Sequence, residues 1–110
     1  MKIIDVHTHL SKLHDSKYSE SHEKNLRYLL AEAKQNKIDR LLIIAGLANA
    51  DGTKTSVKGL VKLVGNNSQI SIIGSFDLSR NSKRELAELE GLLKERMIVG
   101  IKLYTGYQHF

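Results

Sequence analysis

The sequence predicts an α/β domain in which strands and helices alternate as β-α-β-α-β-α-β and the strands pair in parallel. Short apolar runs rich in β-branched residues recur four times along the 110 residues. Between these runs, leucine, valine and alanine recur at the spacing of one helical face. Strands that alternate with helices imply parallel pairing with right-handed crossovers. We therefore expect one α/β domain over residues 1–110.

The first half of the chain supplies two strands and one helix. Residues 2–6, KIIDV, are short and β-branched and predict the first strand. The stretch SESHEKNLRYLLAEAKQNK predicts a helix that Ser19 or Ser21 can cap. Residues 40–46, RLLIIAG, are nearly all apolar, as expected of a parallel strand covered on both faces. The predicted inner face of the helix comprises Leu26, Leu29, Leu30 and Ala33.

The second half repeats the pattern after a loop, ANADGTKT, which contains an Asp-Gly turn signal. SVKGLVKLVGNN predicts a second helix, residues 70–76 a third strand, SKRELAELEGLLKER a third helix, and residues 97–104 a fourth strand. The inward residues of the two helices are Val57, Leu60, Val61 and Val64, and Leu86, Leu89, Leu92 and Leu93.

Two architectures fit this order of elements. One is an open four-stranded sheet with helices on its faces. The other is the first half of an eight-stranded barrel, which normally needs about 250 residues. In a half barrel both outer strands lack neighbours and expose pairing edges. We then expect the chain to form a homo-oligomer through these edges or to belong to a longer protein.

Composition narrows the function classes. A hydrophobic content of 41% with 26% charged residues is typical of a globular domain. The sequence has no run long enough to span a membrane, no signal peptide pattern and no cysteine, which predicts a cytoplasmic protein without membrane partners. The net charge of +5 is scattered over helical stretches and aromatics make up only 5%, so nucleic acid is not an expected partner.

The opening MKIIDVHTHL carries the clearest chemical pattern. Residues two apart on a strand share a face, so Asp5, His7 and His9 are expected to point the same way. Both imidazoles would emerge at the carboxyl end of the first strand, where parallel α/β folds build their sites. Two imidazoles at this spacing can bind one divalent ion, and Asp5 can orient a ligand or contact the metal. The alternative is a pair of surface histidines in a loop.

The other three histidines carry less information. His14 and His22 lie in a predicted loop and near a helix start, where exposure to solvent is the usual case. His109 follows the fourth strand and either lines the same mouth or lies in a loop.

Lys102 stands inside the apolar run VGIKLY. If the face carrying Ile101 and Leu103 meets helices, Lys102 points to the interior, toward the same mouth as the histidines. A desolvated lysine loses its proton more readily. It can then act as a base, pair with a substrate carboxylate or, once carbamylated, bridge two metals. The alternative is a lysine paired with a carboxylate at the strand end.

Together, DVHTHL in the first strand and VGIKLYTGYQHF about ninety residues later resemble the amidohydrolase superfamily, in particular its amidohydrolase-related branch of metal-dependent TIM-barrel hydrolases. The similarity covers the whole chain in order and spacing and is specific at its two ends. The resemblance implies an amidohydrolase-like barrel, present as its amino-terminal half. It also implies that His7 and His9 bind a divalent metal, usually zinc, and that Lys102 is a candidate catalytic residue.

The resemblance implies a hydrolase acting on C–N or C–O bonds of a small-molecule substrate. The family takes further histidines from strands five and six and an aspartate from strand eight, which this sequence does not contain. We therefore expect this chain to be weakly active or inactive alone. The alternative is a non-catalytic half-barrel interaction domain that self-associates or pairs with a complementary half.

Overall fold

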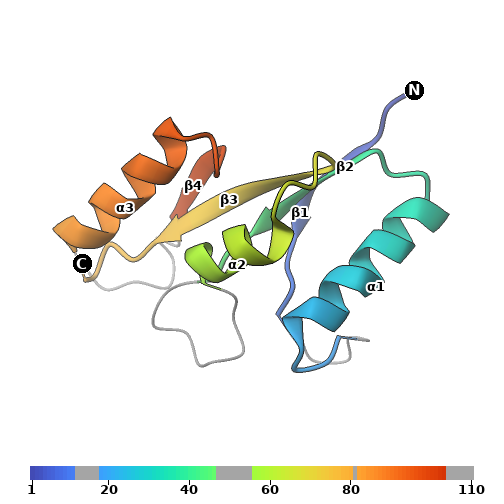
Figure 1. Cartoon of the computed structure of the whole chain (residues 1–110), viewed down its shortest axis with the longest axis horizontal. Coiled ribbons are helices and arrows are strands. Elements are labelled where there is room, and N and C mark those ends of the chain that lie inside the picture. The colour runs from blue at the N-terminus through green and yellow to red at the C-terminus, as the bar shows by residue number, and fades with distance from the viewer. Residues whose placement is uncertain (12–17, 47–55, 81, 104–110) are drawn as a thin grey trace.

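The computed structural model describes residues 1–11, 18–46, 56–80 and 82–103 (Figure 1). Within these ranges, strands and helices alternate in the predicted order. The elements are β1 (Ile4–Thr8), α1 (His22–Gln35), β2 (Arg40–Ile44), α2 (Val57–Val64), β3 (Ile70–Phe76), α3 (Lys83–Lys94) and β4 (Gly100–Leu103). None of the helices in these ranges is long and apolar enough to cross a membrane. The predicted Asp-Gly turn and Tyr104 lie outside the described residues.

Each helix begins at a serine that satisfies one of its free backbone N–H groups. Ser21, Ser56 and Ser82 are the N-caps, and each hydroxyl accepts a hydrogen bond from the N–H three residues further on, at 3.1 to 3.3 Å. Such caps stabilise a helix start by about 1 kcal/mol each. Of the two serines predicted to cap the first helix, Ser21 is the one that does so.

The four strands form one parallel sheet in the order β1-β2-β3-β4. Each strand therefore lies beside its neighbour in sequence, and the sheet curls as half of a barrel (Figure 1). This arrangement confirms the predicted parallel α/β half barrel. The pairing of β2, β3 and β4 is regular, whereas the pairing of β1 with β2 shifts register between Asp5 and Thr8.

One face of the sheet meets the helices. Ile70, Ile72 and Phe76 of β3 share a core with Leu60 of α2 and Leu89 of α3. Apolar residues of α1 pack against the same core: Leu26, Leu29 and Leu30. Because alternate residues of a strand point to opposite faces, the residues between these core positions line the other face, which we call the open face.

Glycine is needed at Gly74 because β3 lies close to side chains of α3 and of the segment that precedes β4. A Cβ there would lie 3.0 Å from Cδ1 of Ile98 and 3.1 Å from Cδ2 of Leu89. The register pairs Gly74 with Ile101, which packs against the same core. Its neighbour Lys102 pairs with Ser75 and so lies on the open face.

Candidate functional site

His7 and His9 meet at the carboxyl end of β1. Their Nε2 atoms lie 3.1 Å apart, and their ring centroids are 5.1 Å apart with planes inclined at 59°. The His7 side chain is exposed and that of His9 is half-buried. The two imidazoles therefore present converging nitrogens at the edge of the sheet, and the prediction that they share a face is confirmed.

The backbone that carries the pair is fixed on both sides. Thr8, between the histidines, is buried, and its hydroxyl donates to the carbonyl oxygen of Leu42 at 2.8 Å. Leu10, just after His9, is 1% exposed and belongs to the core. Because Thr8 and Leu10 face the helix side, His7 and His9 face the open side.

A buried amide adds a third anchor. Asn25 of α1 is 2% exposed, and its Nδ2 donates to the carbonyl oxygens of Leu10 at 2.7 Å and Ser19 at 2.9 Å. Its Oδ1 accepts from the backbone N–H of Ser19 at 2.8 Å. Sequence reasoning missed this residue, because asparagine in an amphipathic helix usually faces water. The only signal was its place one residue before the apolar Leu26.

Asp5 occupies a different environment from the one predicted. Its Oδ1 accepts a hydrogen bond from the backbone N–H of His7 at 3.1 Å, and the register shift follows directly after it. It pairs with Leu41, a core residue, and its charge acts on Tyr18. The strict alternation that places Asp5 on the same face as the histidines is therefore interrupted at this bulge.

Tyr18 lies close to the start of α1 with its ring edge against Tyr28, at a centroid distance of 5.7 Å. Burial raises the pKa of the Tyr18 phenol, and the charges of Tyr28, Glu32 and Asp5 raise it further. The carboxylate of Asp5 thus disfavours ionisation of the Tyr18 phenol.

The geometry of the two imidazoles fits a metal ion. Two nitrogen ligands at about 2.0–2.1 Å from a tetrahedral zinc lie about 3.3–3.4 Å apart, close to the 3.1 Å found between the Nε2 atoms. A hydrogen bond between one protonated and one bare Nε2 gives the same spacing. Within the described ranges, no group of three or more His, Asp or Glu side chains is arranged to hold an ion. Among the described residues, the two imidazoles thus converge without a third such side chain beside them.

Lys102 lies far from this pair within the sheet. It is half-buried on β4, whereas the histidines are on β1, and two strands lie between them. Three spacings of about 4.8 Å place β1 and β4 roughly 14 Å apart along the sheet. The structure thus puts His7, His9 and Lys102 on one face but brings only the histidines together. His22 begins α1, and His14 and His109 lie outside the described residues.

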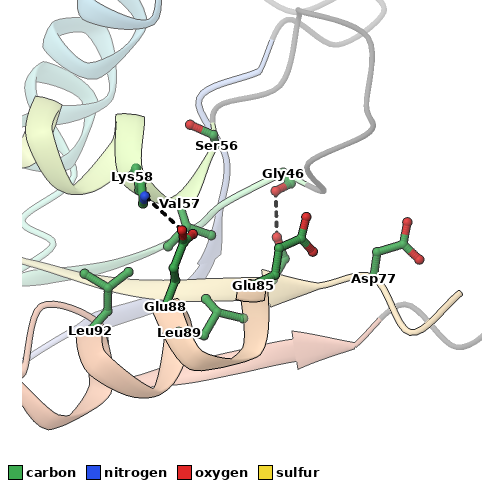
Figure 2. A pocket seen from close by; sticks show the side chains of 10 residues that line it. Gly46, Ser56, Val57, Lys58, Asp77, Glu85, Glu88, Leu89 and Leu92 are labelled. Carbon is green, nitrogen blue, oxygen red and sulfur yellow. Dashed lines mark hydrogen bonds and ion pairs between the residues drawn. The ribbon is translucent and has the colours of Figure 1, made fainter. Parts of the chain in front are cut away.

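A separate cavity of about 170 Å³ lies between α2 and α3, beside the carboxyl ends of β2 and β3 (Figure 2). Val57, Leu89 and Leu92 give it apolar walls. At its rim, the Lys58 ammonium contacts a Glu88 carboxylate oxygen at 3.2 Å, and this hydrogen bond, followed by that of Arg84, lowers the pKa of Glu88.

Two polar residues at strand ends also line this cavity. The Ser75 hydroxyl donates to the carbonyl oxygen of Gly46 at 2.6 Å and ties β3 to the end of β2. Asp77 is 7% exposed and accepts a hydrogen bond from the backbone N–H of Ser79 at 3.0 Å. Sequence reasoning did not single out this cavity, although Asp77 directly follows the third strand.

No protein-family model matches this chain, and neither the curated proteins nor the solved structures contain a significant match to it.

Proposed function

We propose that this chain is a metal-dependent hydrolase domain of the amidohydrolase type, acting on C–N or C–O bonds of a small molecule. The observation that carries the proposal is the 3.1 Å approach of the His7 and His9 Nε2 atoms at the carboxyl end of a parallel strand. This end of a curled parallel sheet is where (β/α) barrels build their sites. We assign the two imidazoles as ligands of one divalent ion, with zinc as the first candidate.

A bound ion of this kind supplies Lewis acidity toward a carbonyl and activates water. The chain's own contribution is to hold the two nitrogens in place. Thr8 and Leu10 anchor the backbone on either side of His9, and Asn25 secures Leu10 from the adjacent helix. A functional site needs its ligands held within about 0.5 Å of the productive geometry, and packed, hydrogen-bonded supporting groups of this kind serve that purpose.

Two imidazoles leave at least one ligand position of a catalytic zinc to other protein donors, since such sites usually have three protein ligands. We therefore propose that this chain alone binds metal at the pair but hydrolyses its substrates weakly. Lys102 remains a candidate catalytic residue because it lies on the same open face.

The test is the zinc content of the purified chain after equilibrium dialysis, measured beside His7→Ala/His9→Ala. We expect about one equivalent of zinc in the parent chain and loss of it in the double variant. His22→Ala is the matched control, because it removes a described histidine that lies on α1 instead of β1. Equal zinc in the parent chain and in the double variant, or none in either, would refute the assignment.

A further inference from the structure

The open face of the sheet carries aliphatic side chains like those that fill a barrel. Ile4 and Val6 of β1 are 51% and 63% exposed, and Ile4 pairs with Arg40, on the face away from the helices. Leu42 of β2 and Ile73 of β3 are half-buried on the same face. Branched aliphatic residues of this kind form the layers inside closed parallel barrels. The core that the three helices share with the sheet lies on the opposite face.

Within the described part of the chain, β1 forms one edge of the sheet and β4 forms the other. β1 pairs only with β2, and β4 pairs only with β3, among the described residues. Both strands run in the same direction, because every pair in the sheet is parallel. Unpaired edges of this sort are templates for another strand.

A second copy of the chain satisfies both edges at once. A two-fold axis along the barrel axis keeps all strands parallel and places β4 of each copy against β1 of the other. Four strands from each copy give eight, the number that closes a parallel barrel with a filled interior. Such a ring closes on itself, so the contact ends at two copies and does not continue into a fibre.

We infer that two copies of this chain close an eight-stranded barrel in which Lys102 of one copy lies beside His7 and His9 of the other. Within one copy, Lys102 is roughly 14 Å from β1 along the sheet, whereas a neighbouring strand lies about 4.8 Å away. All three side chains belong to the open face, which becomes the barrel interior. The partner copy thus contributes a primary amine to the histidine site. The assignment of this amine to a site depends on the proposed function, but the closure of the barrel does not.

Association is tested by light scattering during size-exclusion chromatography. We expect twice the chain mass of 12.4 kDa for the parent chain. Val6→Lys places a charge inside the barrel and should return the mass to that of one chain. Leu86→Lys is the matched control: Leu86 is 51% exposed but lies on α3, so this variant should stay dimeric. A monomeric parent chain, or a dimer that Val6→Lys leaves intact, overturns the inference.

Strand pairing is tested by thiol cross-linking, which is simple because the chain has no cysteine. Val6→Cys and Lys102→Cys chains are mixed and treated with a short bifunctional maleimide. We expect a cross-linked species containing one chain of each kind, and none from Leu86→Cys mixed with Lys102→Cys. A dimer without the first cross-link overturns the pairing of β4 with β1. A dimer that binds no zinc would refute the proposed function and leave the barrel standing, and a zinc-binding monomer would do the reverse.

Discussion

Replacing Asn25 with alanine should destabilise the domain far more than a polar residue on a helix usually does. The substitution removes two donors and one acceptor at once. The carbonyl oxygen of Leu10 is then left without its bond at a residue that is 1% exposed, where water does not replace it. A buried group left unsatisfied costs about 1–3 kcal/mol. The two Ser19 groups are closer to solvent and add about 0.5–1 kcal/mol each.

The expected total is a loss of about 2–5 kcal/mol in the free energy of unfolding, which is large beside the roughly 5–15 kcal/mol of a whole domain. For a chain of this size it corresponds to a fall in Tm of roughly 10–30 °C. The assay is urea unfolding followed by far-UV circular dichroism. The midpoint urea concentrations of the variant and the parent chain are compared, provided that both show the same dependence of unfolding free energy on urea concentration.

Asn36→Ala is the matched control. Asn36 is exposed at the end of α1, and its Nδ2 donates to the carbonyl oxygen of Glu32 at 2.8 Å. Water replaces that bond, so we expect a change within about 0.5 kcal/mol. If Asn25→Ala proved no more destabilising than Asn36→Ala, the buried amide would not hold the strand end as argued.

Asn25→Asp separates the hydrogen bonds from side-chain size. An ionised carboxylate cannot donate to the Leu10 and Ser19 carbonyls, so burial and these oxygens should raise the folded-state pKa of the new carboxyl above its unfolded value. A group with a raised folded pKa contributes stability at low pH, and that stability is lost as the pH rises through the folded pKa. We therefore expect the variant to be closer to the parent chain near pH 4 than at pH 7. A constant difference across this range would contradict the donor role of Asn25.

Two further predictions concern the backbone conformation at Gly65 and the ionisation of Tyr18. Gly65 has φ of 58° and ψ of −131°, so Gly65→Ala should cost about 1–3 kcal/mol in urea unfolding, although its Cβ would meet nothing within 4 Å. Gly91→Ala, equally unobstructed but inside α3, should instead stabilise by up to about 1 kcal/mol, and the same sign for both would refute the conformational argument. Because the pKa of Tyr18 is raised in the folded state, stability should fall as the pH rises above 10. Tyr18→Phe should flatten that alkaline decline in thermal unfolding, and an unchanged decline would assign it to other groups.

Most of the fold was predictable because the apolar pattern and the packing agree. The alternating core positions of β3 and Leu89, Leu92 and Leu93 of α3 are where their periodicity places them. The prediction was wrong for Leu86, which is 51% exposed on α3 because it lies one turn before the core contact of Leu89. Strand limits were less accurate: residues 2–6 were predicted and β1 is Ile4–Thr8, since pairing with Arg40 and Ile43 sets its ends. For the same reason β4 begins at Gly100, three residues after the start of the predicted strand 97–104, whose last residue lies outside the described part of the chain.

The candidate site was predictable only where local alternation holds. His7 and His9 flank a buried threonine, so the two-residue spacing correctly indicates a shared face. Asp5 lies on the other side of a bulge that its own carboxylate helps to form by accepting the His7 N–H. Spacing alone does not reveal such a bulge. Nor does it reveal Asn25, whose burial depends on contacts with a segment fifteen residues earlier in the chain.

In the proposed dimer, metal binding and association are linked, because the Lys102 ammonium of one copy lies beside His7 and His9 of the other. A cationic side chain repels a divalent ion across a short distance. We therefore expect zinc to weaken the dimer and, by reciprocity, the dimer to bind zinc less tightly than the monomer. Lys102→Met, which keeps the side-chain length but removes the amine, should abolish this repulsive coupling. Sedimentation equilibrium with and without zinc measures the coupling, and the same dissociation constant under the two conditions would show that the metal and the partner copy do not meet at one site.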